Sequence, residues 1–142
     1  MDLPELLRKG LVRKSNPDKK LAHDLMLTAE RDLKAAADNI KSGNHDWALA
    51  ISYNAMLSAG RALMAFMGYS ASAEAHHLAV VQFCASVLPP HSGPLAVAFN
   101  RYRVRRHDVI YGEAGSVGPE EAESAIKSAT AFVDKMKEKI KV

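Results

Sequence analysis

The sequence contains one cysteine and few aromatic residues, and both shortages narrow the class of protein. A lone Cys84 leaves no partner for an intrachain disulfide, so a disulfide-stapled fold is excluded. Cys84 lies in the apolar run AVVQFCASVL (79–88), and we interpret it as a buried core thiol rather than a nucleophile. Aromatic residues make up 6% of the chain and alanine is plentiful, a composition that favours helices over a β-sandwich.

Long apolar runs are also missing. No stretch of about 18 apolar residues occurs, so no membrane span is expected. The first ten residues, MDLPELLRKG, carry acids early and do not have the pattern of a signal peptide. We therefore expect a cytoplasmic protein. The net charge of +3 is compatible with RNA contact without arguing for it.

What the sequence does contain is a series of helical patterns separated by proline and glycine. We expect one domain over residues 1–142, in which residues 1–16 form a short helix and a loop, and no strand pattern appears. Asn16 is expected to cap the first long helix, with Pro17 at its first position. The long helices are expected at 17–42, 45–67, 73–88, 93–111 and 118–141, the last closing on lysines up to Lys141. Short loops predict an all-α, up-and-down antiparallel bundle of about five helices.

The helix at 45–67 is apolar on most sides. Trp47, Ile51 and Phe66 are part of this apolar content. A helix that is apolar all round is expected in the centre of a bundle.

The helix at 93–111 places an arginine in an apolar stripe. Leu95, Phe99, Tyr102 and Val109 share one face at 100° per residue, and Arg106 lies among them. A buried arginine is costly unless it is paired. Two interpretations of Arg106 remain open. It forms a structural ion pair with an acid on a neighbouring helix, or it faces a groove or subunit interface where it awaits a phosphate.

Asp32, Asp38 and Asp46 are the candidate partners for such an ion pair. Other residues of the arginine helix fall elsewhere on the wheel. Arg103, His107 and Tyr111 line one edge of the stripe, whereas Arg101, Arg105 and Asp108 point to the opposite side.

The edge residues offer some chemistry. His107 is a candidate general acid or base, because the pKa of histidine is near neutral. Tyr111 is a poor base at neutral pH, because the ordinary pKa of a tyrosine side chain is about 10. His76 and His77 are adjacent and point to different faces, which is poor spacing for a zinc site, so neither a metal nor a cofactor is expected.

These residues together resemble the HEPN (higher-eukaryote and prokaryote nucleotide-binding) family. Its signature is an arginine, a polar residue, three further residues and a histidine, and Arg106 to Tyr111 fits with tyrosine at the last position. The segment NHDWALAISYNAMLSAGRALMAFMGY (44–69) and the pair His76-His77 are similar to family stretches. The run 105–136 resembles the prokaryotic branch in which the signature ends in tyrosine.

The resemblance implies a small helical bundle that forms a homodimer and associates with nucleotides or RNA. It implies a shared groove in which Arg103, Arg106 and Tyr111 bind the ligand. The chain would then be the toxin-like half of a toxin–antitoxin pair with a minimal nucleotidyltransferase, and Tyr111 is the candidate acceptor of an adenylyl group. The first alternative is a weak, metal-independent endoribonuclease using Arg106 and His107, with Tyr111 at the position of the motif histidine. The second alternative is a non-catalytic helical scaffold.

Overall fold

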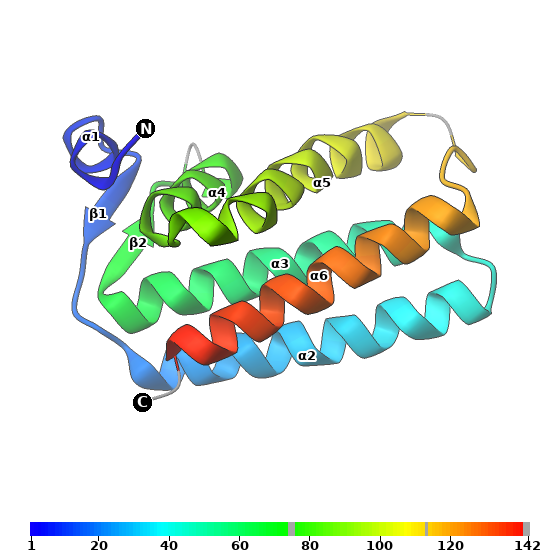
Figure 1. Ribbon diagram of the computed structural model, residues 1–142, viewed down its shortest axis with the longest axis horizontal. Coiled ribbons are helices and arrows are strands. Elements are labelled where there is room, and N and C mark those ends of the chain that lie inside the picture. The colour runs from blue at the N-terminus through cyan, green and yellow to red at the C-terminus, as the bar shows by residue number, and fades with distance from the viewer. Residues whose placement is uncertain (74–75, 113, 141–142) are drawn as a thin grey trace.

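Four long helices form the body of the protein. The computed structural model describes residues 1–73, 76–112 and 114–140. The long helices are α2 (Lys19–Lys41), α3 (His45–Met67), α5 (Gly93–Tyr111) and α6 (Pro119–Ile140). Their direction alternates along the chain, so that consecutive long helices run antiparallel, whereas α3 and α6 lie side by side and run in the same direction (Figure 1). The predicted all-α bundle is therefore confirmed.

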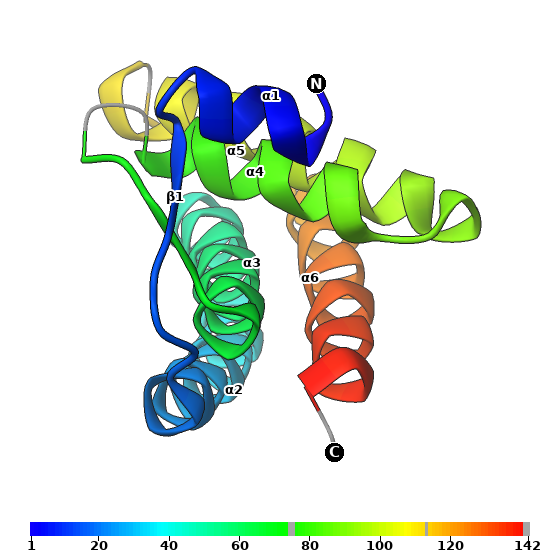
Figure 2. The same ribbon diagram turned by 90° about the vertical axis from the view of Figure 1, so that its left-hand side faces the viewer.

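Two shorter helices cross one end of this bundle. They are α1 (Leu3–Arg8) and α4 (His76–Val87), and a 3-10 turn, η1 (Pro90–Ser92), leads from α4 into α5. Figure 2 looks along the long helices and shows α1 and α4 running across them. Residues 74–75 at the expected start of α4 and Lys141 at the expected end of α6 lie outside the described residues.

A small antiparallel sheet corrects the expectation of a strand-free chain. Strand β1 (Val12–Lys14) pairs with β2 (Tyr69–Ala71), so part of the expected N-terminal loop is a strand. Gly68 ends α3 in the left-handed conformation at φ 86°, and its carbonyl accepts a hydrogen bond from the backbone of Ser15 at 2.9 Å. Three-residue strands are too short to show an alternating pattern in the sequence.

The start of α2 also differs from the sequence prediction. Asp18, rather than Asn16, caps the helix, and its carboxylate accepts a hydrogen bond from the backbone of Leu21 at 2.9 Å. The backbone N–H of Asp18 in turn donates to the carbonyl of Ala65 at 2.8 Å. This contact to the end of α3 fixes where α2 can begin.

Helix α3 lies at the centre of the bundle, as predicted, and packs against α2, α4, α5 and α6 (Figure 1). Trp47 is an exception to its predicted burial, because 62% of this residue is exposed. Three aromatic rings lie where α3 faces α5 and α6. The ring centroids of Tyr53 and Phe99 are 5.8 Å apart, and those of Phe99 and Phe132 are 4.8 Å apart. These three buried rings join α3, α5 and α6.

Helices α3 and α4 approach closely at Gly60. A Cβ atom at this position would lie 2.7 Å from Cγ1 of Val80 and 3.2 Å from Sγ of Cys84. Cys84 is fully buried, and burial raises the pKa of its thiol to about 12. The prediction of a core thiol at Cys84 is confirmed.

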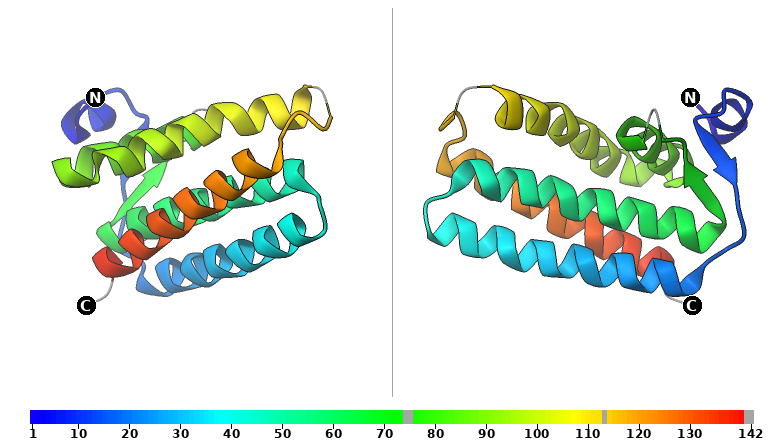
Figure 3. Two further views of the ribbon diagram at one scale, coloured as in Figure 1. Left: turned by 45° about the vertical axis from the view of Figure 1, so that its right-hand side comes forward. Right: turned by 180° about the vertical axis from the view of Figure 1, so that it is seen from behind.

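One side of α5 faces outward, away from the other helices (Figure 3). Three apolar residues on it are strongly exposed at intervals of seven: Val97 (65%), Val104 (48%) and Tyr111 (74%). Within the described ranges, none of the helices is long and apolar enough to cross a membrane.

Candidate functional site

Arg106 lies inside the apolar stripe of α5, where the helical period places it. Phe99 and Tyr102 on this stripe are buried, and Leu95 and Val109 are half-buried. Arg106 itself is half-buried, with its side chain beside α3 rather than in open solvent.

The guanidinium of Arg106 contacts an aromatic ring and is only partly satisfied. Its Cζ atom lies 5.8 Å from the centre of the Tyr53 ring. Its Nε atom is buried and has no hydrogen-bond partner in the part of the chain that the structure describes. A half-buried guanidinium with an unpaired donor carries a positive charge that an anionic ligand beside it would balance.

The predicted ion pair of Arg106 is not formed by the described residues. Asp32 accepts from Arg31 at 3.2 Å, and Asp46 accepts the backbone N–H groups of Gly115 and Val117 at 2.7 and 3.1 Å. The two acids of α2 are remote because α3 lies between α2 and α5 (Figure 1). Asp46 is near the end of α5, but its carboxylate holds the loop that follows.

Tyr53 and His77 form a hydrogen-bonded pair beside Arg106. The hydroxyl of Tyr53 lies 2.9 Å from Nδ1 of His77, and the two rings stack with centroids 5.7 Å apart. Burial raises the pKa of Tyr53 to about 12, although the charges of Arg106 and Arg103 oppose this. Tyr53 therefore stays protonated at neutral pH.

The pKa of His77 is lowered from its ordinary value. Burial is the largest cause, followed by the charge of Arg106. His76, Arg103 and Arg61 lower it further. Each titratable group of the described residues that shifts this pKa is an arginine or a histidine, and the three arginines make the surroundings of His77 electropositive.

We call Arg103, Arg106, Tyr53 and His77 the arginine–tyrosine–histidine cluster. It joins residues of α3, α4 and α5. Sequence reasoning found the two arginines and missed Tyr53 and His77. One feature of the sequence could have indicated this pair. Tyr53 lies in an apolar helix, and a buried tyrosine hydroxyl needs a hydrogen-bond partner from another part of the chain.

The other two predicted site residues lie outside this cluster. The rings of His107 and Tyr111 are 4.9 Å apart, and both residues are exposed near the end of α5. Arg103 lies on the same edge of α5 as His107 and Tyr111 and also belongs to the cluster. Its Nε donates to Oδ1 of Asn100 at 3.1 Å.

The side chain of Arg105 contacts α6, whereas the helical wheel predicted that it points outward. Its Nε and one terminal nitrogen donate to the two carboxylate oxygens of Glu121 at 2.8 and 3.0 Å. It also donates to the carbonyl of Ser116 at 3.1 Å. Arg105 therefore joins α5 to the start of α6, while Arg101 is exposed as predicted.

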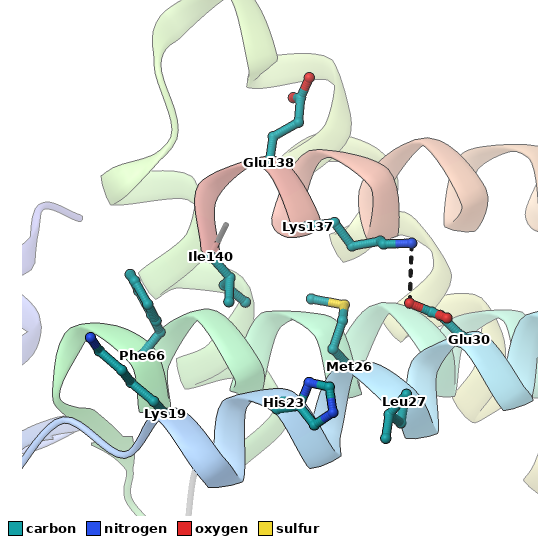
Figure 4. Close-up of a pocket in the computed structure, with 9 residues that line it drawn as sticks. All are labelled: Lys19, His23, Met26, Leu27, Glu30, Phe66, Lys137, Glu138 and Ile140. Atoms are coloured by element: carbon teal, nitrogen blue, oxygen red, sulfur yellow. Dashed lines mark ion pairs between the residues drawn. The ribbon is translucent and has the colours of Figure 1, made fainter. Parts of the chain in front are cut away.

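A cavity of about 620 Å³ lies away from the cluster, between α2 and α6. Figure 4 shows Met26 and Phe66 among its apolar walls and an ion pair of 3.1 Å between Lys137 and Glu30 across it. None of the predicted site residues lines it. No group of three or more metal-ligating side chains occurs among the described residues.

Comparison with known proteins gives a family match that covers most of the chain. No curated protein matches the sequence. The family model described as the HEPN domain matches residues 22–140, which include α3, α4, α5 and every residue of the cluster. The chain belongs to the HEPN domain family.

Proposed function

We propose that the chain acts as a homodimeric module that binds the phosphate groups of nucleotides or RNA at Arg106. The observation that carries this proposal is the half-buried guanidinium of Arg106, whose buried Nε has no hydrogen-bond partner among the described residues. Desolvating a charged donor without pairing it is unfavourable. A phosphate beside the guanidinium would supply the missing negative charge.

A second cation supports a phosphate ligand. Arg103 lies three residues before Arg106 and influences the same two groups, because both arginines affect the pKa values of Tyr53 and His77. Two guanidinium groups on one helix can contact different oxygens of one phosphate or two successive phosphates of an RNA strand.

The exposed face of α5 supports a homodimer. Val97, Val104 and Tyr111 form an apolar stripe at seven-residue spacing, and we call it the α5 stripe. Such a stripe suits contact with the same stripe of a second copy in a two-fold interface. Because Arg103 lies on the helix between the α5 stripe and Arg106, this dimer would place the arginines at the margin between the two copies.

The direct test is binding of a short oligouridylate to the wild type and to Arg106→Gln, followed by fluorescence anisotropy. We expect saturable binding by the wild type and loss of at least tenfold in affinity in the variant. Lys34→Gln, at an exposed lysine on α2, is the control for a general loss of positive charge. Equal affinity of Arg106→Gln and wild type would refute the proposal.

We further propose Tyr111 as an adenylyl acceptor for a nucleotidyltransferase partner in a toxin–antitoxin pair. Tyr111 is 74% exposed at the end of α5 in the single chain, and because it belongs to the α5 stripe, the proposed modification would occur on the monomer before two copies pair. The phenolic oxygen would attack the α-phosphate of ATP, pyrophosphate would leave, and the phenolic proton would pass to a base of the partner. Mass spectrometry after incubation with such a partner and ATP should find the added mass on Tyr111. A chain modified elsewhere, or not at all, argues against this role.

The ribonuclease alternative with Arg106 and His107 stays a prediction. It requires cleavage of RNA without metal, with loss of cleavage in Arg106→Ala and in His107→Ala. Equal cleavage by the wild type and both variants would show a contaminating nuclease.

A further inference from the structure

We propose that His77 is a second phosphate-binding group of the site at Arg106, and that it takes up a proton when the phosphate binds. This inference rests on the proposed function, because it needs a phosphate at Arg106. It adds a residue of α4 to a site otherwise built on α5, and it makes phosphate affinity depend on pH.

The hydrogen bond with Tyr53 orients the His77 ring. The two groups are 2.9 Å apart, and the stacked rings hold the imidazole plane against α3. Where the Tyr53 hydroxyl donates to Nδ1, a neutral His77 carries its proton on Nε2. That N–H is then a donor for a phosphate oxygen. A protonated His77 keeps the same donor and adds a positive charge, and its new Nδ1–H donates to the Tyr53 hydroxyl oxygen, which changes from donor to acceptor.

The charges around His77 explain why a ligand would change its protonation. Arg61 on α3, His76 on α4, and Arg103 and Arg106 on α5 all disfavour a proton on the imidazole. Helix α1 also packs against α4, and none of its charged side chains belongs to this set. A phosphate placed among these cations brings negative charge, which favours the protonated imidazole.

The position of His77 in α4 also favours an anion near its side chain. His77 is the second residue of this twelve-residue helix, so it lies in the first turn. The N-terminal end of a helix carries partial positive charge, which favours an anion. An anion that contacts Arg106 and His77 would thus meet positive potential from two helices.

The sign of the pH dependence follows from these charges. In the free protein the pKa of His77 is lowered, so His77 is neutral at pH 7. In the complex the phosphate raises this pKa. Affinity therefore increases as pH falls through the pKa of the complex, by at most tenfold per pH unit for one proton, and is level at higher pH.

The choice of ligand separates protein protonation from ligand protonation. A terminal phosphate has a second pKa of about 6 and loses charge in the same range. A short oligouridylate without terminal phosphates has only phosphodiester groups, which keep their charge between pH 5.5 and 8. Uridine 5′-monophosphate, measured in parallel, shows whether the site prefers a terminal phosphate or an internal one.

The experiment measures the dissociation constant of both ligands from pH 5.5 to 8 for the wild type and three variants. For the phosphodiester ligand, we expect wild-type affinity to rise severalfold toward pH 5.5. His77→Gln should bind more weakly and without this rise. His76→Gln is the matched control at the neighbouring histidine, and it should keep the rise. Arg106→Gln should lose binding at every pH.

The outcomes distinguish the two proposals. If Arg106→Gln loses binding while His77→Gln keeps the pH dependence of the wild type, the role of His77 is wrong and the proposed function stands. If the wild type binds neither ligand, both are wrong. A second measurement needs no variant. Calorimetry of oligouridylate binding to the wild type at pH 6.5, in two buffers of different ionisation enthalpy, counts the protons that are taken up on binding. A count of zero would overturn the inference even if His77→Gln did not fold.

Discussion

The guanidinium carbon of Arg106 lies 5.8 Å from the centre of the Tyr53 ring, and no described residue accepts a hydrogen bond from its Nε. A cation–π contact of this kind stabilises by about 0.5–1 kcal/mol at an exposed site and about 2 kcal/mol when desolvated. A buried donor without a partner costs about 1–3 kcal/mol. The two effects nearly cancel, so the fold gains little from Arg106.

Replacing Arg106 by methionine should therefore leave stability nearly unchanged. Methionine keeps an unbranched apolar stem against Tyr53 and removes the unpaired donor. We expect the free energy of unfolding in urea to change by less than about 1 kcal/mol. Breaking a buried ion pair would instead cost about 3–5 kcal/mol. A loss of that size would favour the scaffold alternative, in which Arg106 has a structural role.

Arg105→Met is the matched comparison on the same helix. Arg105 donates two hydrogen bonds to the carboxylate of Glu121, and both side chains are partly exposed. Solvent screening limits such a pair to about 1 kcal/mol. We expect Arg105→Met to be the less stable of the two variants in the same urea titration.

Removal of the Tyr53 hydroxyl should weaken the fold and release His77. Tyr53→Phe deletes one hydrogen bond in the protein interior, which costs about 0.5–1.5 kcal/mol. Tyr102→Phe is the control, because Tyr102 is also buried and its hydroxyl has no hydrogen bond among the described residues. Urea unfolding should therefore separate the two variants. Equal stabilities would mean that the bond between Tyr53 and His77 contributes nothing net.

The stability of the free protein should fall as the pH is lowered through the range of histidine titration. The pKa values of His76 and His77 are both lowered in the fold, mainly by burial. Below the ordinary pKa of about 6.5, the unfolded chain binds protons that the folded chain does not, so unfolding becomes easier. Above that pH the effect vanishes.

Thermal unfolding between pH 5 and 8 measures this effect. His77→Gln should have a flatter profile than the wild type below pH 6.5. Lys34→Gln, which removes a charge at an exposed position on α2 but no histidine, should follow the wild type. Identical profiles for all three proteins would contradict the lowered pKa of His77.

The sequence predicted the long helices because their apolar residues recur at helical spacing and their ends carry proline or glycine. It could not predict the β1–β2 pair, which depends on contacts between residues 12–14 and 69–71. The sequence also could not predict that Asp18, rather than Asn16, caps α2. That choice depends on the backbone hydrogen bond from Asp18 to Ala65, which is 47 residues away.

The candidate site shows the same division between local and long-range information. The helical wheel placed Arg106 in the apolar stripe, because neighbours on one helix follow a fixed period. The wheel could not show that Tyr53 and His77, which come from two other helices, meet beside it. Asp46 was an acceptable partner for Arg106 by residue type, but its carboxylate binds the backbone of Gly115 and Val117.

A side chain at Gly60 should disturb the contact between α3 and α4. The added Cβ of Gly60→Ala would lie 2.7 Å from Cγ1 of Val80, a branched side chain with little freedom to rotate. Overpacking costs about 1–3 kcal/mol, whereas alanine gains about 1 kcal/mol in helix propensity. We expect a net loss of stability in urea unfolding. Gly93→Ala, where a Cβ would meet nothing within 4 Å, should be neutral or stabilising.

A charge in the α5 stripe should separate the proposed homodimer. Val104 is 48% exposed at the middle of this stripe, between Val97 and Tyr111. In a two-fold contact of this face, Val104→Glu would bury two like charges close together, which is strongly unfavourable. Leu27→Glu is the control, because Leu27 is 52% exposed on α2 and away from the stripe. Light scattering after size exclusion should give a dimer mass for the wild type and Leu27→Glu and a monomer mass for Val104→Glu. A dimer in all three proteins would place the interface elsewhere, and a monomeric wild type would reject the homodimer itself.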